Sequence, residues 1–169
     1  MVFSDLFFLF VFLPAFILLY RLGGWLDDRH SPDQLNPSHC WRNAVLVVFS
    51  LLFYAWGEPV YVLLMIVTVL LNYLSALWMV RSVSTRKIAL VTGLVMNLLI
   101  LGSFKYLGFF ACTLNSLGLE VPVPEISLPI GISFYIFQSV SYLVDVYRSD
   151  APAQRRYADL LLYISMFPQ

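Results

Sequence analysis

Five apolar segments, most of them long enough as helices to approach the thickness of a lipid bilayer, dominate this sequence. They occupy residues 3–20, 43–56, 60–80, 88–112 and 128–147. As an α-helix, the third segment is about 31 Å long and spans the hydrocarbon core of a membrane. The second is only about 21 Å long, so it needs a thinner region, surrounding protein or flanking residues. The pattern predicts an all-α fold, a polytopic transmembrane bundle of about five helices.

The composition excludes an ordinary water-soluble domain. Hydrophobic residues make up 60% of the chain and charged residues 12%, whereas soluble domains carry about 25% charged residues. The net charge is zero and no basic patch alternates with aromatic residues, so we expect membrane lipids as neighbours and no nucleic acid as a partner. The start lacks a basic region and a cleavage site, so the first segment is expected to be retained as a span.

The basic residues are distributed unevenly among the loops. Nine of the ten lie in or beside the first, third and fifth loops. They are Arg21, Arg29, Arg42, Arg81, Arg86, Lys87, Arg148, Arg155 and Arg156. The second and fourth loops contain Glu58, Glu120 and Glu125 and no basic residue. Because Lys and Arg mark the cytoplasmic side of membrane proteins, we expect the N-terminus outside and the odd-numbered loops inside.

A sixth apolar segment begins near the end of the sequence, at residues 159–167. As a helix it would be about 13 Å long, less than half a bilayer. No basic loop follows it. We therefore expect residues 1–169 to form the N-terminal part of one membrane domain that is truncated at its C-terminus.

A polar stripe runs through the fifth segment. Gln138, Ser141, Tyr142, Asp145 and Arg148 fall within about 140° of one another on a helix. One interpretation is helix–helix contact, with Asp145 and Arg148 forming an ion pair at i,i+3 spacing. The other is that the stripe lines a polar path through the membrane, because polar groups facing lipid are costly. The helix alone leaves both open.

Other polar residues inside the segments have similar alternatives. Lys105 lies about 10 Å from the outer end of the fourth segment; it either extends to the interface through its long stem or faces an internal cavity. Thr68, Asn72, Ser75 and Ala76 follow helical spacing in the third segment and predict close helix packing.

No complete catalytic or metal-binding motif occurs in the sequence. His30, His39 and Cys40 lie in or beside a polar, proline-containing loop, and their spacing fits no zinc pattern, so we expect a solvated loop and no metal site. Phosphate-binding loops, nucleophile elbows and paired zinc-binding histidines are also missing from the sequence.

Several stretches resemble the N-terminal part of the membrane-bound O-acyltransferases, specifically the bacterial alginate O-acetylation type. They are "MVFSDLFFLFVFLP", "SLLFYAWGEP", "FKYLGFF", "LPIGISFYIFQSVSYLVDVYR" and "DLLLYISMFPQ", in this order along the whole chain. The fourth stretch is the most specific of the five.

The resemblance implies an enzyme of the bacterial cytoplasmic (inner) membrane that transfers acetyl to hydroxyls of an exported, alginate-like polysaccharide. A cytoplasmic thioester such as acetyl-CoA would be the donor and a substrate, with no bound cofactor. A periplasmic or extracellular acetyltransferase would be the partner. The residues that would line the tunnel between donor and acceptor are Lys105, Gln138, Ser141, Tyr142 and Asp145.

The family's catalytic residue is a histidine in a later span, where it would act as a base or acyl relay. His30 and His39 match no family motif, so we expect no catalytic residue in this chain and no activity from the chain alone. Two alternatives stay open: transfer of D-alanine to teichoic acid by the same fold, and a membrane bundle or transporter without chemistry.

Overall fold

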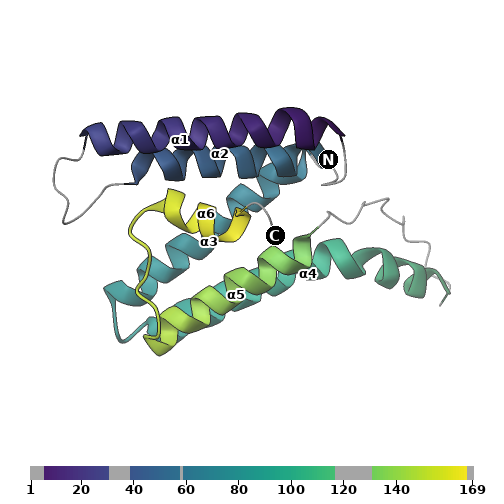
Figure 1. Cartoon of the computed structure of the whole chain (residues 1–169). Coiled ribbons are helices and arrows are strands. Elements are labelled where there is room, and N and C mark those ends of the chain that lie inside the picture. The colour runs from purple at the N-terminus through teal and green to yellow at the C-terminus, as the bar shows by residue number, and fades with distance from the viewer. Residues whose placement is uncertain (1–5, 31–38, 58, 117–130, 167–169) are drawn as a thin grey trace. The chain divides into compact units, whose positions relative to one another are not determined.

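The computed structural model describes residues 6–30, 39–57, 59–116 and 131–166. Within these ranges every regular element is helical (Figure 1). The elements are η1 (Phe8–Phe12), a π-helix, and the α-helices α1 (Leu13–His30), α2 (Cys40–Gly57), α3 (Tyr61–Arg81), α4 (Arg86–Ser116), α5 (Ile132–Arg148) and α6 (Tyr157–Ser165). The predicted all-α fold is confirmed.

Four helical stretches are long and apolar enough to cross a membrane. They are Phe8–Arg29, Cys40–Gly57, Tyr61–Arg81 and Arg86–Tyr106. The chain is therefore a multi-pass membrane protein. The fifth predicted segment corresponds to α5, whose 17 residues make about 26 Å of helix. It is shorter than these four, and its crossing stays a prediction.

The first two helices extend beyond their predicted ends. The sequence predicts that the first span ends at Tyr20, but α1 continues to His30. The second helix has 18 residues, about 27 Å, because it includes flanking residues from Cys40 to Gly57. The polar stretch from Asp27, predicted to be a solvated loop, is helical as far as His30, and residues 31–38 lie outside the described ranges.

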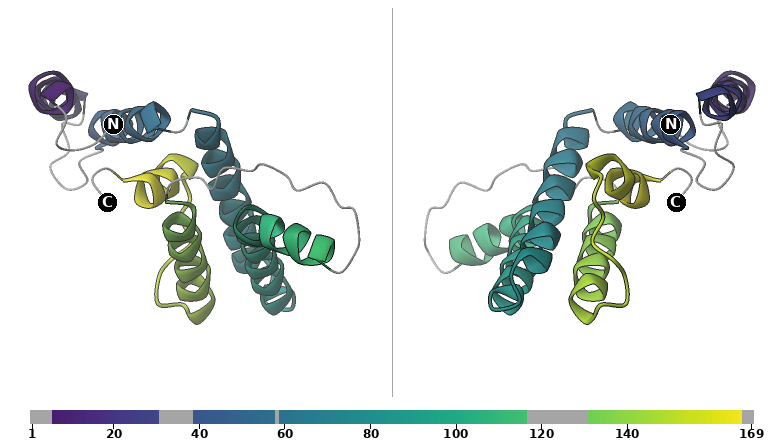
Figure 2. Two further views of the ribbon diagram at one scale, coloured as in Figure 1. Left: turned by 90° about the vertical axis from the view of Figure 1, so that its right-hand side faces the viewer. Right: turned by 90° about the vertical axis from the view of Figure 1, so that its left-hand side faces the viewer.

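The described helices group into two compact units (Figure 2). The first comprises Met1–Leu63 and Arg156–Gln169, and contains η1, α1, α2 and α6. The second comprises Leu64–Arg155, and contains most of α3 together with α4 and α5.

In the first unit, α1 and α2 lie side by side and pack through aromatic rings (Figure 1). The ring centroid of Phe49 lies 5.2 Å from that of Phe12 and 5.4 Å from that of Phe16. Phe8 meets Phe53 edge-on at 5.8 Å. Tilted and edge-on pairs of this kind contribute about 0.5–1.5 kcal/mol each beyond the burial of their surface. These rings therefore fix the contact of η1 and α1 with α2.

The π-helical turn of η1 has a local cause in the sequence. Pro14 has no backbone N–H, and a proline ring clashes with the carbonyl four residues earlier, here that of Phe10. A wider turn before the proline relieves this clash. The first span therefore begins with a distorted turn rather than a regular α-helix.

α6 packs against α2 in the same unit. The Asn43 side-chain amide donates a hydrogen bond to the Asp159 carboxylate at 3.3 Å. Leu160, Leu161 and Ile164 of α6 are buried. The start of the sixth apolar segment is thus helical and packed in the first unit.

In the second unit, α3, α4 and α5 meet around Gly93 of α4. A Cβ atom at this position would lie 2.6 Å from Cδ1 of Leu143 on α5 and 3.3 Å from Cβ of Ser75 on α3. Leu143 is completely buried, so its side chain has little room to move away. Small residues let membrane helices approach closely, and Gly93 has this role here.

The small and polar residues of α3 face its neighbours, as predicted. Thr68, Asn72, Ser75 and Ala76 are all buried. The Thr68 hydroxyl donates to the Leu64 carbonyl at 2.8 Å, and Ser75 bonds in the same way to its own helix. The predicted packing role of these four residues is confirmed.

Candidate functional site

The polar residues predicted on α5 differ in their burial. Gln138 and Asp145 are half-buried and Ser141 is exposed, whereas Tyr142 is only 5% exposed. Gln138, Ser141 and Asp145 are spaced three and four residues apart and therefore share one face. We call these three residues the α5 polar face. It is the part of the predicted stripe that the described chain leaves partly open.

The surroundings of the α5 polar face are mixed. Phe134 and Phe137 beside it are 80% and 62% exposed, whereas Ile136 and Leu143 on the opposite side are buried. Phenyl rings are stable against lipid, but an amide and a carboxylate within a span need protein or water as neighbours. The α5 polar face is thus suited to contact a further protein surface or a water-filled path.

The buried Tyr142 takes part in a packing contact and is not part of the α5 polar face. Its hydroxyl oxygen accepts a hydrogen bond from the backbone N–H of Gln154 at 3.0 Å. From α3, the Tyr73 hydroxyl donates to the carbonyl of Arg155 at 2.8 Å. The two tyrosines therefore hold the segment that follows α5 against the helices of the second unit.

The ion pair predicted between Asp145 and Arg148 does not form. Among the described residues, the ion pair present joins Arg42 to Asp28 at 3.8 Å. Arg148 is exposed at the end of α5, where water and salt screen such a pair and it contributes little stability. Asp145 and Arg148 therefore have the spacing of an ion pair on a helix but do not form one.

The end of α5 is stabilised by an arginine from another helix. Nη2 of Arg86, at the start of α4, donates to the Val146 carbonyl and to the Ser149 hydroxyl, both at 2.8 Å. The last carbonyls of a helix have no partner within the helix, and a cation near them is favourable. Arg86 thus joins the start of α4 to the end of α5.

Lys105 lies far along α4 from Arg86. Their separation of nineteen positions corresponds to about 28 Å of helix, close to the roughly 30 Å thickness of the hydrocarbon core. Lys105 is exposed, and its Nζ lies 5.6 Å from the centroid of the Tyr106 ring. If Arg86 marks one interface, Lys105 reaches the opposite one, which favours the interfacial interpretation over a cavity.

A buried amide pair joins α3 to α4, and the sequence pattern indicates only one of its members. Asn97 Nδ2 donates to Asn72 Oδ1 at 2.7 Å, and Asn72 Nδ2 donates to Asn97 Oδ1 at 3.1 Å. Each amide also donates to its own helix, to the carbonyls of Thr68 and Gly93. The space beside the pair has no room for a water molecule. The pair is therefore a closed packing contact and holds no ligand.

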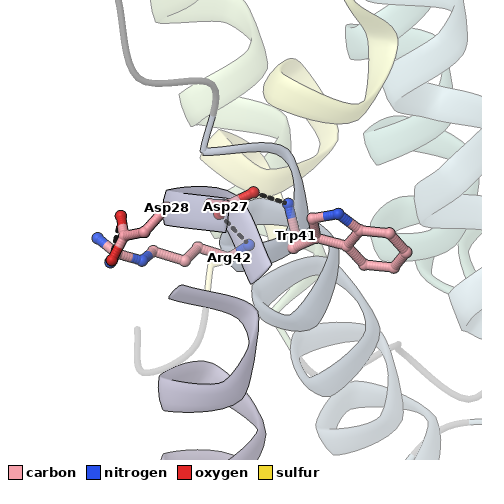
Figure 3. A network of polar contacts seen from close by, with 4 residues as sticks. All are labelled: Asp27, Asp28, Trp41 and Arg42. Carbon is pink, nitrogen blue, oxygen red and sulfur yellow. Dashed lines mark hydrogen bonds and ion pairs between the residues drawn. The ribbon is translucent and has the colours of Figure 1, made fainter. Parts of the chain in front are cut away.

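A second unpredicted polar network joins α1 to α2 (Figure 3). Asp27 is 3% exposed, and its carboxylate accepts hydrogen bonds from the backbone N–H groups of Trp41 at 2.9 Å and Arg42 at 3.1 Å. These N–H groups lie in the first turn of α2, where they have no partner within the helix. Asp27 therefore caps α2 and explains why α1 continues so far beyond Tyr20.

The histidines and cysteine near the first loop form no cluster in the part of the chain that the structure describes. His39 and Cys40 are exposed at the start of α2, and the side chain of His30 lies outside the described part. No three His, Cys, Asp or Glu residues come together within the described ranges. The absence of a metal site stays a prediction for the whole chain.

Comparison with known proteins gives relatives along the entire sequence. "Probable alginate O-acetylase AlgI" of Pseudomonas putida is 41% identical over 176 residues, which cover 99% of this chain. The protein of the same name from Pseudomonas syringae pv. tomato is 39% identical over 176 residues, again 99% of the chain. "Peptidoglycan O-acetyltransferase" of Helicobacter pylori is 27% identical over 196 residues and the whole chain.

The matched part of each relative is limited. The chain spans 33%, 31% and 36% of these three proteins, about one third of their length. The chain matches no family model and no solved structure. The similarity nevertheless runs over nearly every residue of the chain, which makes this sequence similar to part of the proteins named as alginate O-acetylases.

Proposed function

We propose that this chain forms part of an integral-membrane O-acyltransferase that moves an acetyl group from a cytoplasmic donor to hydroxyls of an exported, alginate-like polysaccharide. The observation that carries this proposal is the similarity, over 99% of the chain, to relatives named as alginate O-acetylases. The cytoplasmic side of the donor rests on the predicted orientation, in which the basic loops face inward.

The chemistry proposed is transfer of an acyl group from sulfur to oxygen. An acceptor hydroxyl oxygen bonds to the acetyl carbonyl carbon, and the bond from that carbon to the sulfur of the donor breaks. The hydroxyl proton passes through a base to the departing thiolate. A thioester such as acetyl-CoA is thus a substrate, and no bound cofactor is required.

Within this reaction we assign the α5 polar face to the wall of the path between donor and acceptor. Its half-buried Gln138 and Asp145 lie on a helix whose opposite side is occupied by packing against α4. Ionisable and amide groups inside membrane spans tend to mark substrate paths, because facing lipid is costly for them. Asp145 lies near the end of α5 that the predicted orientation places at the cytoplasmic side.

The alternatives differ in the acceptor and in the presence of chemistry. The Helicobacter pylori relative is named as a peptidoglycan O-acetyltransferase, so peptidoglycan is a second candidate acceptor. Its identity of 27% is below the 41% of the Pseudomonas putida relative, which favours an alginate-like acceptor. The relatives' names favour acetyl over D-alanyl transfer, and an enzyme over a transporter. A periplasmic acetyltransferase partner and an inner-membrane location remain part of the proposal.

A chimeric protein tests the proposed function directly. Residues 1–169 replace the matching segment of the Pseudomonas putida relative, in cells that lack that relative and produce alginate. We expect the chimera to restore O-acetylation because the segment supplies equivalent helices and an equivalent α5 polar face. The measurement is the acetyl content of the purified alginate by NMR, normalised to the amount of chimera in the membrane.

Two controls make the result interpretable. The unaltered relative sets the full signal, and a second chimera joined within residues 150–155 tests whether the position of the junction matters. Acetylation absent from both chimeras, with both present in the membrane at the level of the unaltered relative, contradicts the proposal. Acetylation of peptidoglycan in place of alginate would make peptidoglycan the acceptor of the proposed reaction.

A further inference from the structure

The second unit contains a cavity that the proposed reaction does not use. It measures about 520 Å³ and is formed by the end of α3, the start of α4, the end of α5 and the segment that follows α5. Both views show the turn between α3 and α4 gathered with the C-terminal end of α5 at the same end of this unit (Figures 1 and 2). The volume lies within the range of sites for small molecules, about 300–1,000 Å³.

Two arginines line this cavity. Arg86 is half-buried and is held in place by its bonds to the Val146 carbonyl and the Ser149 hydroxyl. Arg155 is exposed, and its backbone carbonyl accepts a hydrogen bond from the hydroxyl of Tyr73. Both bonds of Arg86 come from one nitrogen, so the guanidinium, which has five N–H groups, retains donors for a ligand.

Neither arginine is neutralised by a carboxylate of the described chain, in which the ion pair present is Arg42–Asp28. The cavity therefore carries two positive charges without a protein counterion among the described residues. Guanidinium groups match phosphate oxygens in shape and charge and bind them with paired hydrogen bonds. The charge of the cavity is complementary to a phosphate-bearing ligand.

The remaining wall of the cavity is apolar and opens at the surface. Met79 is buried, whereas Val80 and Val83 are 66% and 86% exposed. A ligand that satisfies both the arginines and these valines combines an anionic group with hydrocarbon. The predicted orientation places this end of the helices at the cytoplasmic leaflet, where anionic phospholipids lie and where basic pockets between spans bind their headgroups.

We propose that this cavity binds the phosphodiester headgroup of an anionic phospholipid of the cytoplasmic leaflet. Arg86 and Arg155 contact the phosphate, and the first part of the acyl chains lies against Val80 and Val83. The bound lipid would join the ends of α3, α4 and α5. This inference does not depend on acetyl transfer, because it rests on the cavity, its charge and the exposed valines.

Lipid binding to the purified protein tests the proposal. The protein, expressed with any natural sequence that flanks these residues, is purified in a neutral detergent, and bound phosphatidylglycerol and phosphatidylcholine are quantified by native mass spectrometry. We expect tighter binding of phosphatidylglycerol. Replacing both arginines, Arg86→Gln with Arg155→Gln, should weaken that binding about 30-fold, from the contribution of each basic residue to anionic-lipid attraction.

A matched control and an independent variant separate the cavity from general charge. Arg81→Gln with Lys87→Gln removes two exposed cations near the same end, and should weaken binding much less than the cavity pair because neither residue lines the cavity. Val83→Glu removes little packing and brings a carboxylate to the opening, so it should also weaken binding. Unchanged thermal unfolding in lipid-free detergent verifies that each variant is folded.

Three results would overturn the proposal. One is equal binding of the two lipids by the unaltered protein. Another is an equal loss of binding in the control pair and the cavity pair. The third is displacement of the lipid by inorganic phosphate or pyrophosphate at the same concentration, which would make the occupant a soluble anion.

Discussion

At the scale of the residue, the amide pair of Asn72 and Asn97 makes the strongest prediction. Replacing either one by Leu leaves the other amide buried without its partner, and an unsatisfied buried polar group costs about 1–3 kcal/mol. We therefore expect each single variant to lower the free energy of unfolding by about that amount. Replacing both should cost less than the sum of the two, because the pair is removed together. The measurement is unfolding in mixed detergents followed by circular dichroism.

The control for this pair is Ser103→Leu, on the exposed side of α4. A substitution away from buried contacts should change the free energy of unfolding by less than about 0.5 kcal/mol. Strictly additive effects of the two Asn variants would show that the pair contributes no coupling. Interhelical hydrogen bonds in membranes average about 0.6 kcal/mol. The free energies of unfolding of the two single variants and the double variant must therefore be measured with an uncertainty below that value.

At the scale of the element, α5 shows what the sequence can predict and what it cannot. The apolar run and the polar residues at helical spacing predict the helix and the face shared by Gln138, Ser141 and Asp145. They do not predict that Tyr142 is buried, because it lies four residues after Gln138 and three before Asp145, at the edge of the same stripe. Its hydroxyl accepts a hydrogen bond from the backbone N–H of Gln154, twelve residues later, and that contact depends on the tertiary structure.

The same limit applies to the other helices. Spacing within α3 predicts the buried positions of Thr68 and Asn72, because a helical pattern is local. Asn97 stands alone in an apolar stretch, and nothing in the local sequence pairs it with a residue 25 positions earlier. Likewise, Asp27 opens a polar stretch that is typical of a solvated loop, and only the start of α2 explains its burial.

The prediction at the scale of the element concerns substitutions on the α5 polar face. In the active chimera, Gln138→Leu and Asp145→Leu should each lower alginate acetylation about tenfold or more, because a small displacement of a bound substrate costs that much. Their amounts in the membrane should stay near the unaltered level, since an interhelical hydrogen bond contributes little stability. Acetyl content and membrane abundance are measured on the same cultures.

Two variants on the same helix serve as matched controls for this face. Phe134→Leu alters an exposed apolar neighbour, and Arg148→Leu removes an exposed charge that forms no ion pair with Asp145. Both should retain acetylation. If activity falls only in proportion to abundance in the Gln138 and Asp145 variants, the face is a packing surface and its assignment to the path is wrong.

At the scale of the whole molecule, orientation in the membrane connects the sequence to the proposed reaction. Reporter fusions after Arg42, Arg86 and Arg155 should place the reporter in the cytoplasm, and fusions near Glu58 and Glu120 should place it outside. Green fluorescent protein, which fluoresces inside, and alkaline phosphatase, which is active outside, are fused separately at each position.

The fusion after Arg155 carries most of the information, because it decides whether α5 crosses. The part of α4 between Arg86 and Tyr106 is apolar enough to cross the membrane, and as a helix it places these two residues about 30 Å apart. Nevertheless Arg86 bonds directly to the carbonyl of Val146 near the end of α5, so the chain must return to the side of Arg86 between Tyr106 and Val146. Its 17 residues give α5 about 26 Å for that return. Opposite locations for the fusions after Arg86 and Arg155 would contradict both the contact and the orientation.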